Sequence, residues 1–234
     1  MLIGIISDIH ANEFALERVL NSAREKKVQR LFVLGDLVGY YFSPGKVLSL
    51  LSQWDTQMIR GNHEDIFAAY FRGNNTHRST VDERLGPGFA SCITDLDEAN
   101  QQFLFNLPES ISIEIEGIRF GLYHGSPGST TEYIYPDADP AKLALYDDED
   151  KDIAFMGHTH HPMIYPGKHT LFINPGSVGQ SRVVGGLAQW GIFNTKNKVY
   201  TPVNTIYNTQ PLKEQILERG VPRSHFIYQV LERK

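Results

Sequence analysis

The sequence predicts an α/β protein, and two observations support this fold class. Three apolar strand-like runs occur in the first 70 residues, LIGIIS, LFVLGD and TQMIRG, and each is followed by a turn and a helix-like segment. Repeated strand–turn–helix units pair their strands in parallel. Polar residues also gather where these strands end, and open α/β sheets place their sites at the carboxyl ends of strands.

The first half of the chain can be assigned element by element. Asn12 is a suitable cap for a helix over 13–27, which has an apolar face. A second helix is predicted to begin near Pro44, between the second and third strands. The polar, Gly-rich segment FRGNNTHRSTVDERLGPG, 71–88, predicts a loop or a small cap over the site, within an insertion at about 71–95. A helix over about 96–106 follows.

The second half of the chain is predicted to be mostly strands. ISIEIEGIRFGLYHG alternates around Glu116-Gly117, which indicates a hairpin. DIAFMGHTH, HTLFINPGS, LAQWGIFN and NKVYTPVN are predicted as further strands, and QPLKEQILERGVP as a helix. There is no internal repeat and no evident linker. We therefore expect one domain over 1–234, in which a second sheet packs on the first with helices outside.

Composition excludes several classes of protein. The 234 residues carry a net charge of −5 and give no basic footprint of the kind found in nucleic-acid binders. The single Cys92 cannot form an internal disulfide, so a reducing compartment is expected and Cys92 is assigned to packing. No apolar run approaches the roughly 20 residues that span a bilayer, and MLIGIISD is too short for a signal sequence. The sequence thus predicts a cytoplasmic protein without membrane contact, and leaves the oligomeric state open.

The segment FMGHTHHP concentrates three of the 9 histidines, His158, His160 and His161, in four positions. Neutral imidazole is the commonest metal ligand in proteins. In an extended segment alternate side chains face the same way, so His158 and His160 could reach one point while His161 faces elsewhere. A metal site is therefore expected, with its other ligands elsewhere in the chain.

Further polar groups follow the predicted strands as short motifs. Each motif alone is weak, because D-x-H or G-N-H can equally form a capped turn. Together they supply two Asp, one Asn and four His, enough for two metal ions with four ligands each if one Asp bridges. The residues are Asp8, His10, Asp36, Asn62, His124, His158 and His160.

The ordered set D-x-H, GD, GNH, H-G and G-H-T-H resembles the calcineurin-like metallophosphoesterases over nearly the whole chain. The segments NEFALERVL, GDLVGY, HGSP and NPGSVGQSR are similar to its branch of small bacterial and archaeal phosphodiesterases. The resemblance implies a four-layer α/β/β/α sandwich with a dinuclear metal centre. It implies a first ion held by Asp8, His10, Asp36 and His160, and a second held by Asp36, Asn62, His124 and His158. His161 is left over and is not counted as a ligand.

The same resemblance suggests roles for residues beside the metals. His63 is the predicted catalytic residue, which protonates the departing oxygen or stabilises transition-state charge as an imidazolium. Glu64 and Asp65 are candidates to orient it, although acidic residues in a first helical turn need no functional explanation. The loop after the last histidines supplies the candidate substrate-binding residues Asn174, Ser177 and Arg182. Ser181 stands where the related branch usually has proline.

The function expected from these residues is metal-dependent hydrolysis of a small phosphodiester or nucleotide, by in-line attack of a hydroxide bridging two divalent ions. Mixed nitrogen and oxygen ligands admit Mn, Fe, Co, Ni or Zn, with Mn favoured. A phosphomonoesterase or nucleotide phosphatase is the main alternative, and an inactive protein-binding scaffold is the other. Protein Ser/Thr phosphatases continue the second metal motif as GD-x-V-D-R-G. The corresponding segment here, GDLVGYYFSP, lacks that Asp and Arg, which argues against a phosphoprotein substrate.

Overall fold

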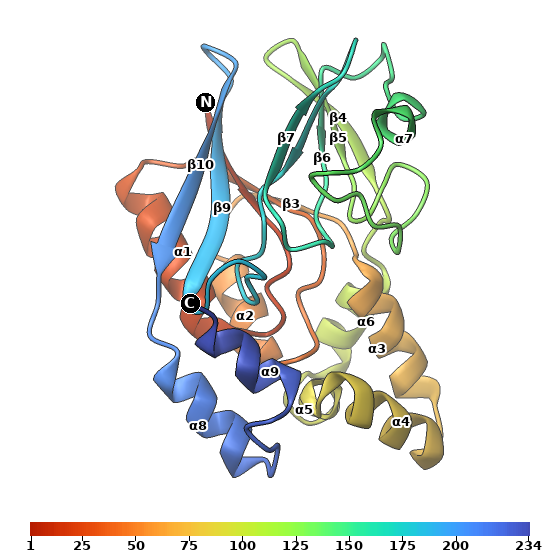
Figure 1. Cartoon of the computed structure of the whole chain (residues 1–234), viewed down its shortest axis with the longest axis vertical. Coiled ribbons are helices and arrows are strands. Elements are labelled where there is room, and N and C mark those ends of the chain that lie inside the picture. The colour runs from red at the N-terminus through yellow and green to blue at the C-terminus, as the bar shows by residue number, and fades with distance from the viewer.

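Two five-stranded sheets pack face to face in the computed structural model, which describes residues 1–234 (Figure 1). The first sheet has the order β10-β9-β1-β2-β3 and consists of β1 (Leu2–Ile6), β2 (Arg30–Val33), β3 (Thr56–Met58), β9 (Leu187–Asn194) and β10 (Val199–Ile206). The second has the order β4-β5-β6-β8-β7 and consists of β4 (Ile111–Ile115), β5 (Ile118–Leu122), β6 (Ile153–Phe155), β7 (Met163–Pro166) and β8 (Leu171–Asn174).

The predicted parallel pairing of the first three strands is confirmed. β1 pairs in parallel with β2, and β2 with β3, because helices α1 (Glu13–Glu25) and α2 (Pro44–Leu51) carry the chain back between them. β9 then pairs antiparallel with β1 on the other side, and β10 extends the sheet. The carboxyl ends of β1, β2 and β3 therefore finish at the same end of this sheet.

The inner faces of the two sheets share one hydrophobic core. Phe32 and Phe193 of the first sheet meet Phe120 and Phe155 of the second, with ring centroids 5.3–6.3 Å apart. Ring pairs at such distances contribute beyond their burial, since edges and faces attract. The loops at the ends of the strands thus extend from two sheets that share a closely packed core.

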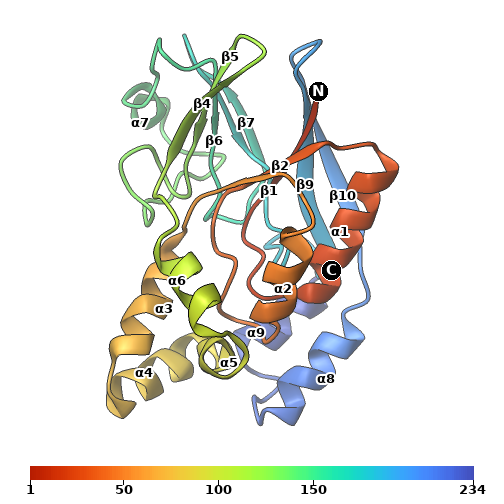
Figure 2. The same ribbon diagram turned by 180° about the vertical axis from the view of Figure 1, so that it is seen from behind.

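The outer faces complete the four predicted layers. α1 and α2 cover the first sheet (Figure 2), and their buried side chains join its core. The second sheet is covered by the short helix α7 (Pro140–Ala144) and its neighbouring loops, through residues such as Ile134 and Leu143 packed on Phe172. The four-layer α/β/β/α architecture is confirmed, although one outer layer is thin.

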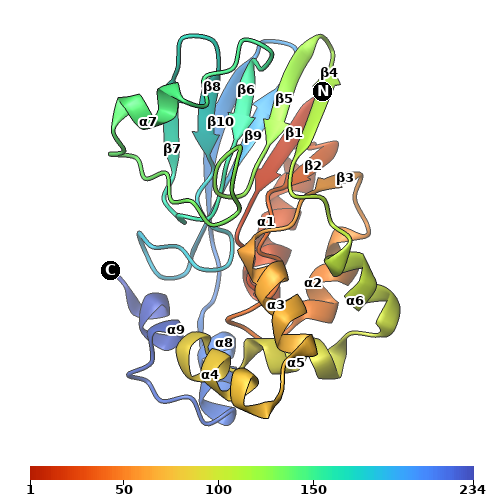
Figure 3. The ribbon, with the colours of Figure 1, turned by 90° about the vertical axis from the view of Figure 1, so that its right-hand side faces the viewer.

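The remaining helices gather at the end where β1, β2 and β3 finish (Figure 3). They are α3 (Asn62–Arg72), α4 (Asn75–Leu85), α5 (Gly88–Asp95), α6 (Glu98–Phe105), α8 (Gln210–Glu218) and α9 (Phe226–Gln229). None of the helices is long and apolar enough to cross a membrane. Cys92 in α5 is buried, and burial raises the pKa of its thiol, as expected for a packing residue.

Several local predictions hold and others need correction. The Asn12 side chain caps α1 by accepting from the Ala15 N–H, and α2 begins at Pro44 as expected. Residues 75–85 of the polar segment 71–88 form the helix α4, so the loop alternative is wrong, while the small cap over the site stays a prediction. α4 has no fully buried side chain, and its sequence accordingly lacks apolar periodicity. The sequence feature that could have predicted this helix is its cap, Asn74, whose side chain accepts from the His77 N–H. β7, α7 and α9 were not predicted.

Candidate metal centre

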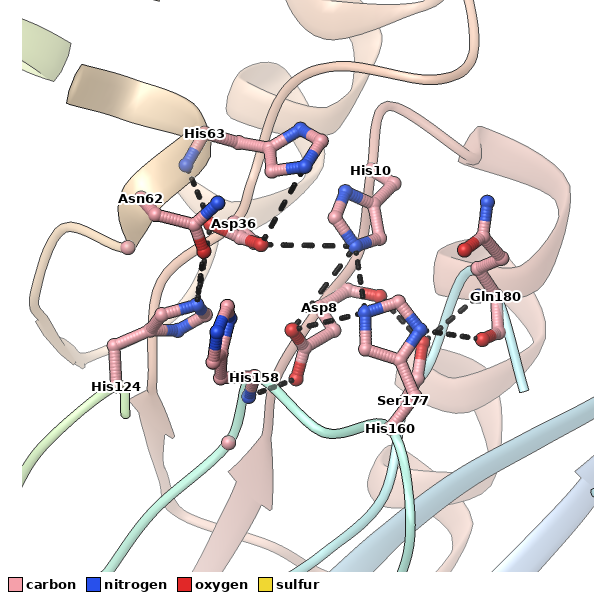
Figure 4. A network of polar contacts seen from close by, with 12 residues as sticks. Asp8, His10, Asp36, Asn62, His63, His124, His158, His160, Ser177 and Gln180 are labelled. Atoms are coloured by element: carbon pink, nitrogen blue, oxygen red, sulfur yellow. Dashed lines mark hydrogen bonds and ion pairs between the residues drawn. The ribbon is translucent and has the colours of Figure 1, made fainter. Parts of the chain in front are cut away.

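All seven predicted ligands converge at the ends of the strands (Figure 4). Asp8 and His10 follow β1, Asp36 follows β2, Asn62 opens α3, His124 follows β5, and His158 and His160 follow β6. Their ligand atoms form two groups, each within 4.8 Å: Asp8, His10, Asp36 and His160, and Asp36, His124 and His158. Asn62 adjoins the second group, because its Oδ1 lies 3.1 Å from His124 Nε2.

The backbone holds five of these ligands in an uncommon conformation. Asp8, His10, Asp36, His158 and His160 have φ between 52° and 65°, in the left-handed region. Each such residue costs about 1–3 kcal/mol, and the surrounding fold must compensate. The turns at these ligands are therefore made by the ligand residues themselves and not by glycine alone. The histidine segment is also not extended at 158 and 160, and these two side chains belong to different groups.

Gly61 is required by the close approach of two site loops. A Cβ at this position would lie 2.2 Å from Asp36 Oδ1 and 2.7 Å from a carbon of the His124 ring. No side chain fits at such distances. The glycine of GNH therefore lets the loop after β3 contact both ligands directly.

Backbone carbonyls fix the orientation of three imidazoles. His10 Nδ1 lies 3.3 Å from the Val38 carbonyl, His124 Nδ1 2.6 Å from Leu34, and His160 Nδ1 2.7 Å from Gln180. A ring nitrogen that faces a carbonyl carries the proton, so each Nε2 lone pair is directed into the site. This arrangement is typical of metal-ligating histidines.

The inward-facing atoms repel one another unless positive charge lies between them. His10 Nε2 and His160 Nε2 are 3.0 Å apart, and in these tautomers both are acceptors. Asp8 Oδ1 and His158 Nε2 are buried without a hydrogen-bond partner. Burial opposes a charge on His124, yet Asp36 and Asp8 raise its pKa to about 10. The donor set therefore fits divalent cations, which would satisfy all these atoms at once.

The Asp36 carboxylate is divided between the two groups. Its Oδ1 lies 3.3 Å from His124 Nε2 in one group, and its Oδ2 lies 3.7 Å from His10 Nε2 in the other. Oδ1 also accepts a hydrogen bond from the His63 N–H at 2.8 Å. The geometry is that of a carboxylate able to bridge two ions.

His63 lies beside the ligands and does not join either group. Its Nε2 is directed toward the site, 4.0 Å from Asp36 Oδ2, and its ring packs against His10, Tyr40 and Phe89. Only 3% of the residue is exposed. Burial lowers its pKa, an effect that Asp36 opposes, and a bound phosphate would further favour the imidazolium.

Glu64 orients the ligand loops and not His63. Its buried carboxylate accepts from four backbone N–H groups: Oε1 from Leu37 and Val38, and Oε2 from Asp36 and Gly61. The same side chain thus joins the loop after β2 to the loop after β3. Burial and the nearby Asp36 raise its pKa to about 7. Its neighbour Asp65 instead pairs with Arg60 at 3.1 Å, away from His63.

We expect Glu64→Gln to destabilise the protein by about 3 kcal/mol, because an amide NH₂ would face two backbone donors. This corresponds to a fall of roughly 6–12 °C in Tm for a chain of this size. Thermal unfolding of the metal-free protein measures it. Asp65→Asn is the matched control, since its half-exposed ion pair should be worth less than about 1 kcal/mol. Equal Tm values for the two variants would contradict this role of Glu64.

Asn174 and Ser177, two of the predicted substrate contacts, are engaged with the ligand loops in the structure. Both are buried: Asn174 Nδ2 donates to the Gly157 carbonyl and to Thr159 Oγ1, and Ser177 Oγ donates to the Asp8 carbonyl. Their polar groups are occupied in holding ligand loops, so they position ligands. A loop motif gives no information about which way such side chains point.

Arg182 is partly exposed and lies close enough to affect the pKa values of Tyr40 and Tyr133 at the site. His161 lies outside both ligand groups, and its ring centroid is 5.9 Å from that of Tyr135.

Sequence reasoning missed the aromatic residues at the site. Tyr40 was visible only as part of GDLVGY, and no sequence signal marked Tyr133, whose ring centroid lies 4.1 Å from that of His158.

Comparisons with known proteins agree with this geometry. Residues 1–198 match the model of the calcineurin-like phosphoesterase superfamily domain. A metallophosphoesterase from Sphaerobacter thermophilus is 28% identical and superimposes with a TM-score of 0.80 over 99% of this chain and 98% of its own. A hypothetical protein from Pyrococcus horikoshii shares the fold, with a TM-score of 0.85, 17% identity, and coverage of 99% and 98% of the two chains.

A phosphodiesterase of Methanocaldococcus jannaschii is 25% identical, with coverage of 87% of this chain and 98% of the relative. The family match covers most of the chain and includes every residue of the two ligand groups. With its two packed sheets and its buried Asp/His cluster, this protein belongs to the calcineurin-like phosphoesterase superfamily.

Proposed function

We propose that this protein is a metal-dependent phosphodiesterase that hydrolyses a small phosphodiester or nucleotide. The observation that carries the proposal is the pair of ligand groups that share Asp36, with one carboxylate oxygen facing each group. Paired divalent ions are a common solution for breaking phosphoester bonds. The similarity to an archaeal phosphodiesterase supports the diester preference.

The metal centre is proposed to hold two divalent transition-metal ions, with Mn favoured over Fe, Co, Ni or Zn. Asp8, His10, Asp36 and His160 would hold one ion, and Asp36, Asn62, His124 and His158 the other. Such ions supply Lewis-acid charge that polarises a phosphate and activates water. Two carboxylates against two divalent ions leave the site net positive, so it attracts an anionic substrate.

Two further side chains have proposed roles toward substrate. His63 would donate the proton on Nε2 to the departing alkoxide oxygen, because this atom is the one directed toward the ligands. Arg182 would bind phosphate oxygens, since its guanidinium is partly exposed at the site and has no carboxylate partner. Glu64 and Ser177 would keep the ligand loops in place during the reaction.

Turnover of bis(p-nitrophenyl) phosphate tests the proposal directly. Metal-free protein should be inactive, Mn²⁺ should restore turnover, and the kcat/KM for the diester should exceed that for p-nitrophenyl phosphate. A preference for the monoester would indicate a phosphomonoesterase or nucleotide phosphatase. No turnover with any of Mn, Fe, Co, Ni or Zn, despite metal binding measured by calorimetry, would indicate a scaffold and overturn the proposal.

A further inference from the structure

A cavity of about 480 Å³ opens beside the second ligand group. Its lining includes the ligands Asn62 and His158, further residues of α3, Arg84 of α4, and Thr131 and Tyr133. Its size falls within the range of about 300–1,000 Å³ found for ligand pockets. A substrate whose phosphate lies at the ligands can therefore extend into it.

The cavity offers apolar surface suited to a planar ring. Ile66 and Ala69 on α3 supply aliphatic contacts, and Tyr133 supplies an aromatic one. The Tyr133 side chain is held in place by His158 and by Tyr135, whose ring is nearly parallel to it at 5.6 Å, and yet the residue is 49% exposed. A rigid exposed aromatic side chain binds a flat partner at low cost in conformational entropy.

The cavity also contains one uncompensated cation. The Asp65 carboxylate is neutralised by Arg60 at 3.1 Å, whereas Arg84 has no carboxylate partner and is exposed. The planar guanidinium binds a phosphate through two parallel hydrogen bonds. Arg84 comes from α4, which packs against α3 and α5 without burying a side chain. α4 thus packs on the core only through the partly buried Val81 and Leu85, and it places the positive charge of Arg84 at the cavity.

We propose that this cavity is a specificity subsite for a nucleotide-like group that carries a second phosphate. The ring would contact Tyr133, Ile66 and Ala69, and the second phosphate would bind Arg84. The substrate class is then a nucleotide phosphodiester with an additional terminal phosphate. This inference rests on the proposed phosphodiesterase function and identifies Arg84 as a residue that determines its specificity.

The test compares adenylyl-(3′→5′)-adenosine with and without a 5′-phosphate, using methyl p-nitrophenyl phosphate as a small reference diester. In the Mn²⁺-loaded wild type, the 5′-phosphorylated dinucleotide should have the higher kcat/KM. Arg84→Ala should lower the ratio of phosphorylated to unphosphorylated dinucleotide by about tenfold. Ala69→Phe, which fills the cavity from an exposed position, should lower the kcat/KM of both dinucleotides relative to the reference diester.

Arg72→Ala is the matched control, because Arg72 is an exposed arginine of α3 that does not line the cavity. It should leave unchanged both the ratio of phosphorylated to unphosphorylated dinucleotide and the ratio of the dinucleotides to the reference diester. Unchanged ratios in Arg84→Ala and Ala69→Phe would overturn the subsite while leaving the phosphodiesterase function intact. If the wild type turned over no diester, the proposed function would fail instead. Calorimetry with the phosphorylated dinucleotide would then test the subsite. Weaker binding to Arg84→Ala than to the wild type is expected, and equal binding would overturn the subsite.

Discussion

Asp36→Asn is expected to lose both metal ions and to lower kcat/KM on a synthetic diester by about 10³-fold or more. Asn has only one oxygen, whereas Asp36 presents one to each ligand group, at 3.3 Å from His124 Nε2 and 3.7 Å from His10 Nε2. Removal of a bridging charge weakens both sites together, and several kcal/mol of transition-state stabilisation depend on the ions. Elemental analysis of the purified variant measures the loss.

The matched control for Asp36→Asn is Asn62→Ala, which removes a ligand of only the second group. This variant should keep one ion per chain. The fold should survive in both variants, because Asn at position 36 can still accept from the His63 N–H, and circular dichroism would show this. Two ions per chain retained by the Asp36→Asn protein would exclude a bridging role.

His63→Ala is expected to keep both ions and to lower turnover by about 10²–10⁴-fold, the usual contribution of a general acid. His63 touches the site through Nε2, 4.0 Å from Asp36 Oδ2, and belongs to neither ligand group. Its removal therefore should not release metal. His63→Asn is a useful second variant, because it preserves more of the packing against Tyr40 and Phe89.

The defect of His63→Ala should also depend on the leaving group. An alkoxide needs a proton in order to depart, whereas a nitrophenolate leaves with little assistance, so the defect should shrink as leaving-group pKa falls. Charge stabilisation by the imidazolium would instead affect all esters about equally. Measured kcat/KM values across a series of esters distinguish the two roles. A constant ratio of wild type to variant would exclude proton donation, and metal loss would exclude the assignment altogether.

Much of the fold was available from the sequence because its determinants are local. Apolar strand runs, the Asn12 cap and the Pro44 helix start each act within a few residues, and the structure confirms them. The hairpin at Glu116-Gly117 is equally local, and both of its residues have positive φ. α4 was missed since none of its residues is fully buried and only Val81 and Leu85 pack on the core. Its position also depends on Tyr70, whose hydroxyl donates to Asp82.

The sequence by itself also predicted which Asp and His residues come together, because motifs at strand ends meet where parallel strands finish. The tertiary structure alone decided how each residue serves the site. Carbonyls of Val38, Leu34 and Gln180, far along the chain from their histidines, direct each Nε2 inward. A hydrogen bond to the Gly157 carbonyl, 17 residues away in the chain, likewise fixes the Asn174 side chain. Side-chain orientation and charge compensation depend on partners brought close only by folding, which is why Arg84 and Tyr133 could not be recognised in the sequence.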